Sequence, residues 1–320
     1  MTPSMTQTVA VLMGGPSAEA EVSRSSAREV AAALTSAGYD AMLLELDEKT
    51  APALVEARPD AVFPALHGPP GEDGTVQGFL EILELPYVGS DVHGSAAAMD
   101  KSIAKSLFRR AGLPVAEDLV IPAGTSPADA RTRILDTLGD RVVIKPLSQG
   151  SAIGVTPVAN GGDLLPGLNT ALSLGGGVLV EPYVLGTELT VGVLDLHEQE
   201  PMAFPVIEIR LAADAWYDYE HRYAADGSEH IIPAPLNDAT TTRLQEVALA
   251  AHRALGLRDL SRADFILGDD GELVLLEVNT LPGMTPTSLY PDGARAVGMN
   301  FEALVDALVE SATSRGPRWS

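Results

Sequence analysis

The chain has 320 residues, of which 46% are apolar, so it can bury large cores and should divide into two or three domains. Its net charge of −23 and its pI near 4.5 argue against duplex DNA or an anionic membrane surface as a partner. It has no cysteine, which excludes disulfides, thiolate catalysis and cysteine metal sites. No apolar run reaches membrane-spanning length, and the start indicates no signal peptide, so we expect a soluble cytoplasmic protein.

The first hundred residues alternate between predicted strands and helices. The apolar spacing places them at 8–13 (strand), 18–36 (helix), 41–46 (strand), 61–66 (strand), 73–83 (helix) and 87–89 (strand). Gly38 is expected to end the first helix. This alternation predicts a parallel, Rossmann-like sheet. The turn at Gly14 and Gly15 lacks the glycine spacing of a dinucleotide-binding fingerprint.

A predicted helix over residues 95–110 leads into the centre of the chain, where strands alternate with loops. One predicted strand, at 141–145, ends in Lys145 and is followed by a loop rich in small residues, and another, at 178–184, carries Glu181. Small residues let backbone N–H groups approach phosphate oxygens, and a lysine supplies a point charge to them. A glycine–serine turn alone is usually structural, but the combination with lysine and an acidic strand end favours a nucleotide site.

The most informative passage is a predicted hairpin near the C-terminus. If the Asp-Gly pair at 270–271 forms the loop, Asp264 falls opposite Glu277, Arg262 falls opposite Asn279, and all four side chains share one face. Two opposed carboxylates need a compensating cation, and hard oxygen ligands favour magnesium. The alternative is a solvent-exposed face. Because the strands are otherwise apolar, we favour a metal–phosphate site, although a register slip of one residue would separate the pairs.

Six motifs occur in one order along the chain. They are Gly14-Gly15-x-Ser17-x-Glu19-x-Glu21-Val-Ser23, His67-Gly-x-x-Gly71-Glu-Asp-Gly74, Met99-Asp-Lys101, Tyr217-Asp-Tyr219, Arg262-x-Asp264-Phe and Glu277-Val-Asn279-Thr-x-Pro-Gly283-Met-Thr. Together they resemble the D-alanine:D-alanine ligase family of the ATP-grasp superfamily, from about residue 8 to residue 310. One such string could arise by chance, but six in order could not plausibly do so.

The resemblance implies a three-domain ATP-grasp fold of the α/β (α+β) class, with ATP held between two antiparallel sheets. We expect an N-terminal Rossmann-like domain at residues 1–100, a central ATP-grasp subdomain at 101–184, and a C-terminal ATP-grasp subdomain with the metal and catalytic residues at 185–320. The family is usually dimeric, so a homodimer is expected.

The family's reaction implies which ligands the chain should bind. ATP phosphorylates the carboxylate of one D-alanine, and the amine of a second D-alanine displaces phosphate through a tetrahedral intermediate, giving the dipeptide of peptidoglycan precursors. By resemblance, two Mg²⁺ ions, which Mn²⁺ could replace, are held by Asp264, Glu277 and Asn279. The implied ATP-binding residues are Lys101, Lys145, Glu181, Val184, Glu188 and Arg222.

Catalytic residues are also implied by the resemblance. Arg262 and the Gly283 N–H would stabilise the developing oxyanion, although Arg262 could instead form a structural salt bridge to Asp264. Glu19 would bind the ammonium group of the first D-alanine. On the sequence alone, a carboxylate that complements a helix dipole explains Glu19 equally well.

The remaining site residues line the expected substrate positions. His67 would lie near the carboxylate of the first substrate, and Ser288 and Leu289 would receive the carboxylate of the second. Tyr223 belongs to a polar loop that closes on the reaction in the family, and it would hydrogen-bond Ser151 and, through it, Glu19.

Three positions depart from the family pattern. Arg222 stands where lysine is common, and its fork changes the reach and the hydrogen-bond geometry. Ala152 replaces a serine and Gln149 replaces a commonly acidic residue, so we expect altered nucleotide affinity with the chemistry retained.

Two alternative functions stay open. The second substrate could be D-serine or D-lactate, although Tyr223 favours an amine over D-lactate. The chain could also be a non-catalytic ATP-binding regulator, against which the presence of Arg262, Asp264, Glu277 and Asn279 argues.

Overall fold

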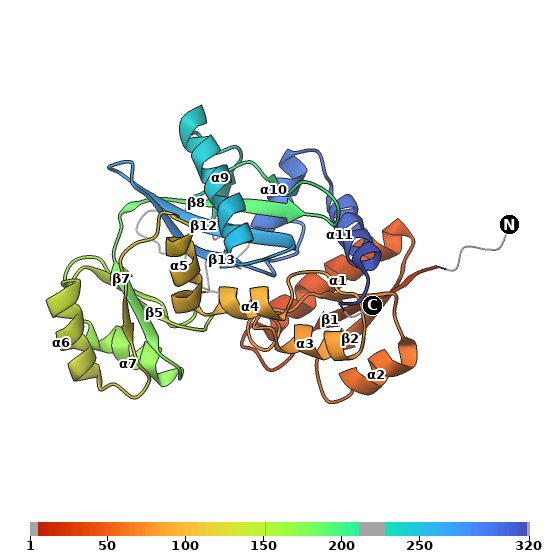
Figure 1. Ribbon diagram of the computed structural model, residues 1–320, viewed down its shortest axis with the longest axis horizontal. Coiled ribbons are helices and arrows are strands. Elements are labelled where there is room, and N and C mark those ends of the chain that lie inside the picture. Colours follow the sequence, from red (N-terminus) through yellow and green to blue (C-terminus); the bar gives the residue numbers. More distant parts are fainter. Residues whose placement is uncertain (1–5, 151, 211–227, 319–320) are drawn as a thin grey trace.

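The computed structural model describes residues 6–150, 152–210 and 228–318. Three β-sheets follow one another along its long axis, with helices packed against them (Figure 1). The predicted combination of α-helices with a parallel N-terminal sheet is confirmed. In the part of the chain that the structure describes, no helix is long and apolar enough to cross a membrane.

The first sheet is parallel, with the strand order β2-β1-β3. Its elements are β1 (Thr8–Met13), α1 (Ala20–Ala37), β2 (Asp40–Glu45), α2 (Thr50–Ala57), β3 (Ala61–Pro64) and α3 (Thr75–Ile82). Gly38 ends α1 as predicted, because its φ of 98° lies in the left-handed region and its N–H caps the helix carbonyls. The short strand expected at 87–89 is wrong: Tyr87 forms only an isolated bridge, since Pro86 has no N–H and Gly89 turns the chain away with a φ of 101°.

The helix predicted over residues 95–110 is two helices, α4 (Val92–Met99) and α5 (Lys101–Arg110). Asp100 separates them in an extended conformation, with a ψ of 105°. Its carboxylate accepts the N–H groups of Ser102 and Ile103 at 2.9 and 3.0 Å, so it caps α5. The N-cap residue Asp100 is therefore the sequence signal for the break between the two helices, which the apolar periodicity does not show.

The second sheet is antiparallel, with the strand order β4-β7-β5-β6. Its strands are β4 (Leu119–Ile121), β5 (Val142–Pro146), β6 (Thr156–Val158) and β7 (Val178–Pro182). The helices α6 (Pro127–Thr137) and α7 (Leu165–Ser173) share a buried core with this sheet through Ile134 and Leu168. The strands predicted at 141–145 and 178–184 are thus confirmed, with ends shifted by one or two residues.

The third sheet is built around the long strand β8, with the order β11-β10-β8-β12-β13 and β9 also paired to β8. Its elements are β8 (Gly186–Asp195), β9 (Met202–Ala203), β10 (Ile207–Arg210), β11 (Glu229–Ile231), α9 (Asp238–Ala254), β12 (Asp259–Gly268) and β13 (Leu273–Asn279). Helix α9 packs on this sheet in one apolar core that also contains Ala104 and Phe108 of α5.

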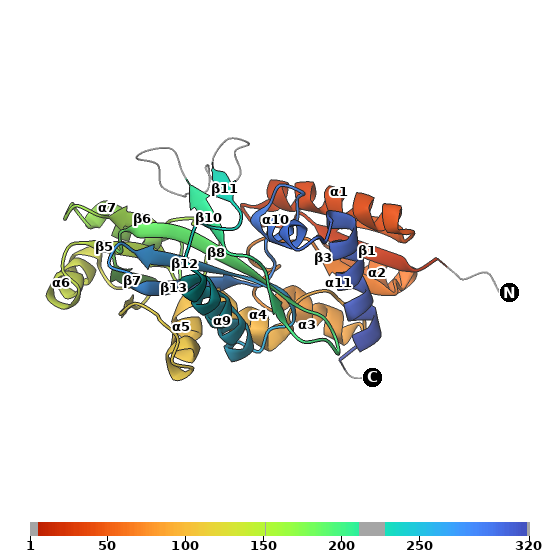
Figure 2. The ribbon, with the colours of Figure 1, turned by 90° about the horizontal axis from the view of Figure 1, so that it is seen from above.

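The chain ends with α10 (Leu289–Ala296) and α11 (Phe301–Arg315). Helix α11 lies beside α1, so the C-terminal segment returns to the first sheet (Figure 2). Each of the three predicted domain ranges contains one of the three sheets. The boundaries at 100 and 184 stay predictions.

The polar residues of the hairpin pair as predicted, but the loop and the strand between them differ from the prediction. Asp264 pairs with Glu277 and Arg262 with Asn279, as expected. The predicted two-residue loop is wrong: Gly268 donates its N–H to Glu272 O at 2.8 Å, which leaves three residues in the turn. Phe265 then pairs with Leu275, and the strand bulges at Leu276. The extra residue in the loop and the bulge offset each other.

Candidate active site

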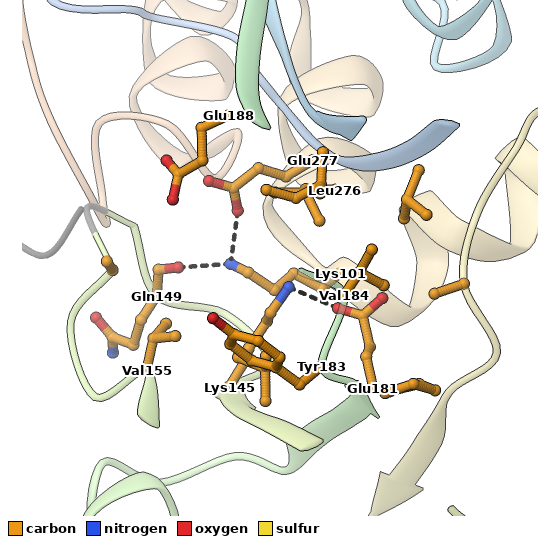
Figure 3. Close-up of a pocket in the computed structure, with 16 residues that line it drawn as sticks. Lys101, Lys145, Gln149, Val155, Glu181, Tyr183, Val184, Glu188, Leu276 and Glu277 are labelled. Atoms are coloured by element: carbon orange, nitrogen blue, oxygen red, sulfur yellow. Dashed lines mark hydrogen bonds and ion pairs between the residues drawn. The ribbon is translucent and has the colours of Figure 1, made fainter. Parts of the chain in front are cut away.

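A first pocket lies between the second and third sheets. It has both apolar and charged lining residues, and the charged side chains extend across it from Glu188 to Glu181 (Figure 3). It is lined by Lys101, Ala116, Val143, Lys145, Gln149, Ala152, Val155, Glu181, Pro182, Tyr183, Val184, Glu188, Ile266, Val274, Leu276 and Glu277. Five of the six predicted ATP-binding residues are therefore in one place. Apolar walls suit a planar base, and the two lysines among the lining residues suit the phosphates joined to it.

Lys101 stands at the start of α5 and points into the first pocket (Figure 3). Its Nζ donates to the Gln149 carbonyl oxygen at 2.7 Å and lies 3.4 Å from Glu277 Oε2. This lysine joins the loop after β5 to the hairpin of the third sheet. Its positive charge therefore lies beside the carboxylate of Glu277, near the end of β13.

Glu181 is held between two lysines at the other wall. Lys145 Nζ donates to Glu181 Oε2 at 2.6 Å, and Lys105 Nζ contacts Oε1. Burial alone would raise the pKa of Glu181, but the charges of Lys145 and Lys105 outweigh it and hold that pKa below its usual range. Lys105 was not among the predicted site residues. Its position one helical turn after Lys101 is the signal that could have pointed to it.

The hairpin face carries the predicted metal residues. Asp264 accepts two hydrogen bonds at 2.8 Å from Arg262, one at 2.7 Å from Thr190 and one at 3.1 Å from Asn279. The opposed carboxylates thus meet cations of the protein itself, Arg262 at Asp264 and Lys101 at Glu277. The salt bridge weighed as the alternative role of Arg262 is present. It does not exclude the catalytic role, because Arg262 also lines a second pocket.

The donor set of this face suits a hard cation. Two carboxylates and an amide oxygen lie on paired strands, and oxygen ligands of this kind are those that Mg²⁺ prefers. Among the described residues, no three histidine, aspartate or glutamate side chains gather closely enough to hold a metal by themselves. A metal here would therefore depend on the Asn279 oxygen and on oxygens of a bound substrate.

The second pocket lies beyond Arg262 and Asn279, between α1 with the loop after β3 on one side and α10 on the other. All the predicted amino-acid-binding residues line it. They are Glu19, His67, Arg262, Gly283, Ser288 and Leu289. The hairpin face is common to both pockets, since Glu277 lines the first while Arg262 and Asn279 line the second.

His67 is buried on the wall of the second pocket. Its Nε2 lies 3.3 Å from Ser26 Oγ. Burial lowers the pKa of His67 to about 4, and the Arg262 charge adds to the effect against a backbone hydrogen bond at Leu281. His67 is therefore neutral near pH 7, and it can hydrogen-bond a substrate carboxylate but not neutralise it.

Glu72 is a residue of the second pocket to which the sequence analysis assigned no role. It accepts the Gly68 N–H at 2.7 Å. Burial, followed by the charge of Glu19, raises the pKa of Glu72 to about 8. Its place in the second sequence motif was visible, but its closeness to Glu19 was not. At pH 7 the pair can share the site with one carboxyl group protonated.

A histidine–carboxylate pair was also missed. His230 Nδ1 lies 2.8 Å from Asp292 Oδ2, and Arg295 lies 2.6 Å from the other oxygen of Asp292. Both members of the pair line the second pocket beside Ser288 and Leu289. They come from β11 and α10, so nothing in the local sequence joins them.

The other predicted residues are placed in part. Val184 and Glu188 line the first pocket, as do Gln149 and Ala152. Ser151, Arg222 and Tyr223 lie outside the described residues, so their roles stay predictions.

Family models match two parts of the chain. The model described as D-ala D-ala ligase C-terminus matches residues 107–310, and that described as D-ala D-ala ligase N-terminus matches residues 47–90. Among curated relatives, the D-alanine–D-alanine ligase of Halalkalibacterium halodurans is 44% identical over 303 residues, or 94% of this chain and 97% of the relative. That of Acidiphilium cryptum is 46% identical over 310 residues, or 96% and 99%.

Solved structures give the same picture. The D-alanine–D-alanine ligase from Bacillus anthracis, complexed with ATP, has a TM-score of 0.82 and 32% identity, and it covers 97% of this chain and 98% of that one. The ligase from Coxiella burnetii has a TM-score of 0.81 and 26% identity over 97% of this chain and 94% of that one. The predicted ATP-grasp fold is confirmed, and this chain belongs to the D-alanine–D-alanine ligase family.

Proposed function

We propose that the chain joins two D-alanine molecules into D-alanyl-D-alanine and converts one ATP to ADP and phosphate. The product is the terminal dipeptide of peptidoglycan precursors. One observation carries the proposal: a single hairpin face lines both pockets, with Glu277 in the first and Arg262 and Asn279 in the second. A phosphoryl group can pass between two substrates only if their reacting ends meet, and this face is where the two pockets adjoin.

The first step transfers the γ-phosphoryl group of ATP to a carboxylate oxygen of the first D-alanine, and ADP leaves. Lys101 and Lys145 come from different elements and supply positive charge for the phosphate oxygens. The carboxylate of Glu19, across the second pocket, is suited to bind the ammonium group of that D-alanine.

The second step forms the amide bond. The amine of the second D-alanine attacks the acyl phosphate carbon, and the tetrahedral intermediate expels phosphate as the nitrogen loses a proton. The Arg262 guanidinium and the Gly283 N–H would neutralise the oxyanion, which is supported by the position of both residues on the wall of the second pocket. The second carboxylate would bind at Ser288 and Leu289, at the start of α10, where the Ser288 hydroxyl now contacts Thr285 at 2.8 Å.

Magnesium is proposed as the metal. Asp264, Glu277 and Asn279 would hold it, and it would supply charge neutralisation at the transferred phosphate. The oxygen donors on paired strands support this choice. Two ions, with Mn²⁺ able to replace them, remain part of the proposal.

The assembly and location of the protein are also proposals. We propose a homodimer, because the family is usually dimeric, and size-exclusion chromatography with light scattering tests it. We propose the cytoplasm as its location, since that is where ATP is made.

The test is phosphate release from ATP and Mg²⁺ with D-alanine, L-alanine, or D-alanine plus D-serine or D-lactate, with products identified by mass. Release with D-alanine alone and a D-alanyl-D-alanine product is expected. Release only with a mixed pair would replace the second substrate. ATP binding without release under any condition would overturn the ligase in favour of a regulator.

A further inference from the structure

Three of the four lysines of this acidic chain gather around one pocket. Lys101, Lys105 and Lys145 lie there, and Lys49 is elsewhere on the surface. Lys101 and Lys145 line the first pocket. Lys105 contacts Glu181 but does not line the pocket, so its part in the site differs from that of the other two.

The two oxygens of Glu181 meet lysines on opposite sides. Lys145 reaches Oε2 at 2.6 Å from the pocket side, as Figure 3 shows. Lys105 reaches Oε1 from α5, and its side chain is 1% exposed. Of the two lysines, therefore, only Lys145 has access to a ligand.

Lys145 cannot bind a phosphate with its full charge while it is paired with Glu181. To bind a phosphate oxygen, its ammonium group must leave or share the Glu181 carboxylate. The Glu181 side chain is 3% exposed, and a buried carboxylate that is left without a cation strongly destabilises the protein. A second cation on the far oxygen removes that obstacle.

We propose that Lys105 is a positioning residue that keeps Glu181 neutralised from behind the pocket, so that Lys145 can exchange the carboxylate for a nucleotide phosphate. The proposal deepens the proposed function and rests on it for the identity of the ligand. It assigns a task to Lys105 that requires no contact with ATP.

The electrostatics of the cluster agree with this exchange. Burial is the largest cause that lowers the pKa of Lys105; Glu181 opposes it, and the Lys145 charge lowers it further. Movement of Lys145 towards a phosphate would remove that last effect and strengthen the ion pair between Lys105 and Glu181. The ion pair between Lys105 and Glu181 is therefore stronger when Lys145 has moved away from Glu181.

Helix α5 positions two of the three lysines, Lys101 and Lys105. Lys101 and Lys105 are one turn apart on α5 and share a face. Because Asp100 caps the helix immediately before Lys101, the first turn is fixed, with Lys101 at Gln149 and Glu277 and Lys105 at Glu181.

The experiment compares the binding of ATP with that of adenosine, which lacks phosphates, by calorimetry without D-alanine. Lys105→Met should lower ATP affinity about tenfold and leave adenosine affinity nearly unchanged, since Lys145 stays on Glu181. Glu181→Gln added to Lys105→Met should restore the ratio of the two affinities, because an amide needs no cation. Lys49→Met, which removes an exposed lysine, is the matched control.

Equal loss of ATP and adenosine affinity in Lys105→Met, or no loss, would overturn the proposal, since a purely structural lysine would not distinguish the ligands. If Lys105→Met does not fold, Glu181→Gln alone decides. The ratio of ATP affinity to adenosine affinity should then rise, and a fall or no change in it would overturn the proposal. If Glu181→Gln also removes a contact with adenine, the affinities for ATP and adenosine fall equally, so their ratio is unaffected. ATP binding without ligation by the unaltered chain would overturn only the proposed function, whereas no ATP binding would overturn both.

Discussion

Asp264 and Glu277 face each other across the β12–β13 ladder, and each carboxylate is met by a different cation. Arg262 Nη2 lies 2.8 Å from Asp264 Oδ2, while Lys101 Nζ lies 3.4 Å from Glu277 Oε2. The tight, bidentate contact at Asp264 and the longer one at Glu277 make the two carboxylates unequal. Glu277 is the one whose cation is more easily exchanged.

This inequality leads to a prediction for Glu277→Gln. The substitution keeps the shape but removes a negative oxygen ligand, so Mg²⁺-dependent ligation should fall on the order of 100-fold or more, with little change in melting temperature. Steady-state phosphate release over a magnesium titration measures it. Glu272→Gln, at an exposed position beside the hairpin turn, is the control. Undiminished turnover at the same magnesium concentration would sink the metal assignment.

Glu72 should make stability depend on pH in a defined direction. Its pKa rises from 4.5 to about 8 on folding, so the folded state holds its proton more tightly. That contribution is complete below pH 4.5 and is lost as the pH rises through about 8. Glu72→Gln should remove it.

Urea unfolding of the wild type and of Glu72→Gln at pH 5 and pH 8 tests this, without nucleotide or metal. The wild type should lose stability relative to the variant between the two pH values. The titrations of other groups cancel in the difference. Parallel curves for the two proteins would show that Glu72 keeps an ordinary pKa.

The hairpin shows how much the sequence can predict. Alternation of side chains and the Asp-Gly signal placed Asp264 opposite Glu277 correctly. The loop length and the bulge at Leu276 were missed because both depend on how β13 packs and twists, which no local pattern records. The prediction of the polar pairs holds because the two deviations offset each other.

Long-range partners mark where the sequence stops being informative. Among the described residues, the structure brings five of the predicted ATP-binding residues to the first pocket and the predicted amino-acid-binding residues to the second. Lys105, Glu72 and His230 were not assigned roles, because their partners Glu181, Glu19 and Asp292 lie on other elements. Spacing within a segment reports faces of helices and strands, whereas these pairs arise only when the segments pack together.

Replacing Gly150 by alanine should not strain the backbone, but it should disturb the second pocket. A Cβ there would lie 3.2 Å from Glu19 Oε2 and 3.7 Å from Glu72 Oε2. Glu19 must then shift by a few tenths of an ångström, so Gly150→Ala should raise the KM for the first D-alanine severalfold with nearly unchanged stability. Gly78→Ala, whose Cβ meets Val92 Cγ2 at an ordinary 3.5 Å, is the control. Equal KM values in the two variants would contradict the predicted contact with Glu19.

Asp259 connects the third sheet to the last helix and to the loop after the first sheet. It is fully buried at the start of β12, where its two oxygens meet Arg315 at 2.7 and 2.8 Å. It also accepts the Ser311 hydroxyl at 2.9 Å and the Gly89 N–H at 2.8 Å. One carboxylate thus joins β12, α11 and the loop after the first sheet.

Asp259→Asn isolates the charge of this residue. Its φ is 61°, a conformation that asparagine also adopts, so the backbone is not strained by the change. The variant leaves the Arg315 guanidinium without its carboxylate, and we expect a loss of about 3 kcal/mol in unfolding free energy. Urea denaturation measures it. Arg210→Ala, which breaks an exposed pair with Glu208, should cost less than about 1 kcal/mol. A similarly small loss for Asp259→Asn would mean that the ion pair between Asp259 and Arg315 contributes little to stability.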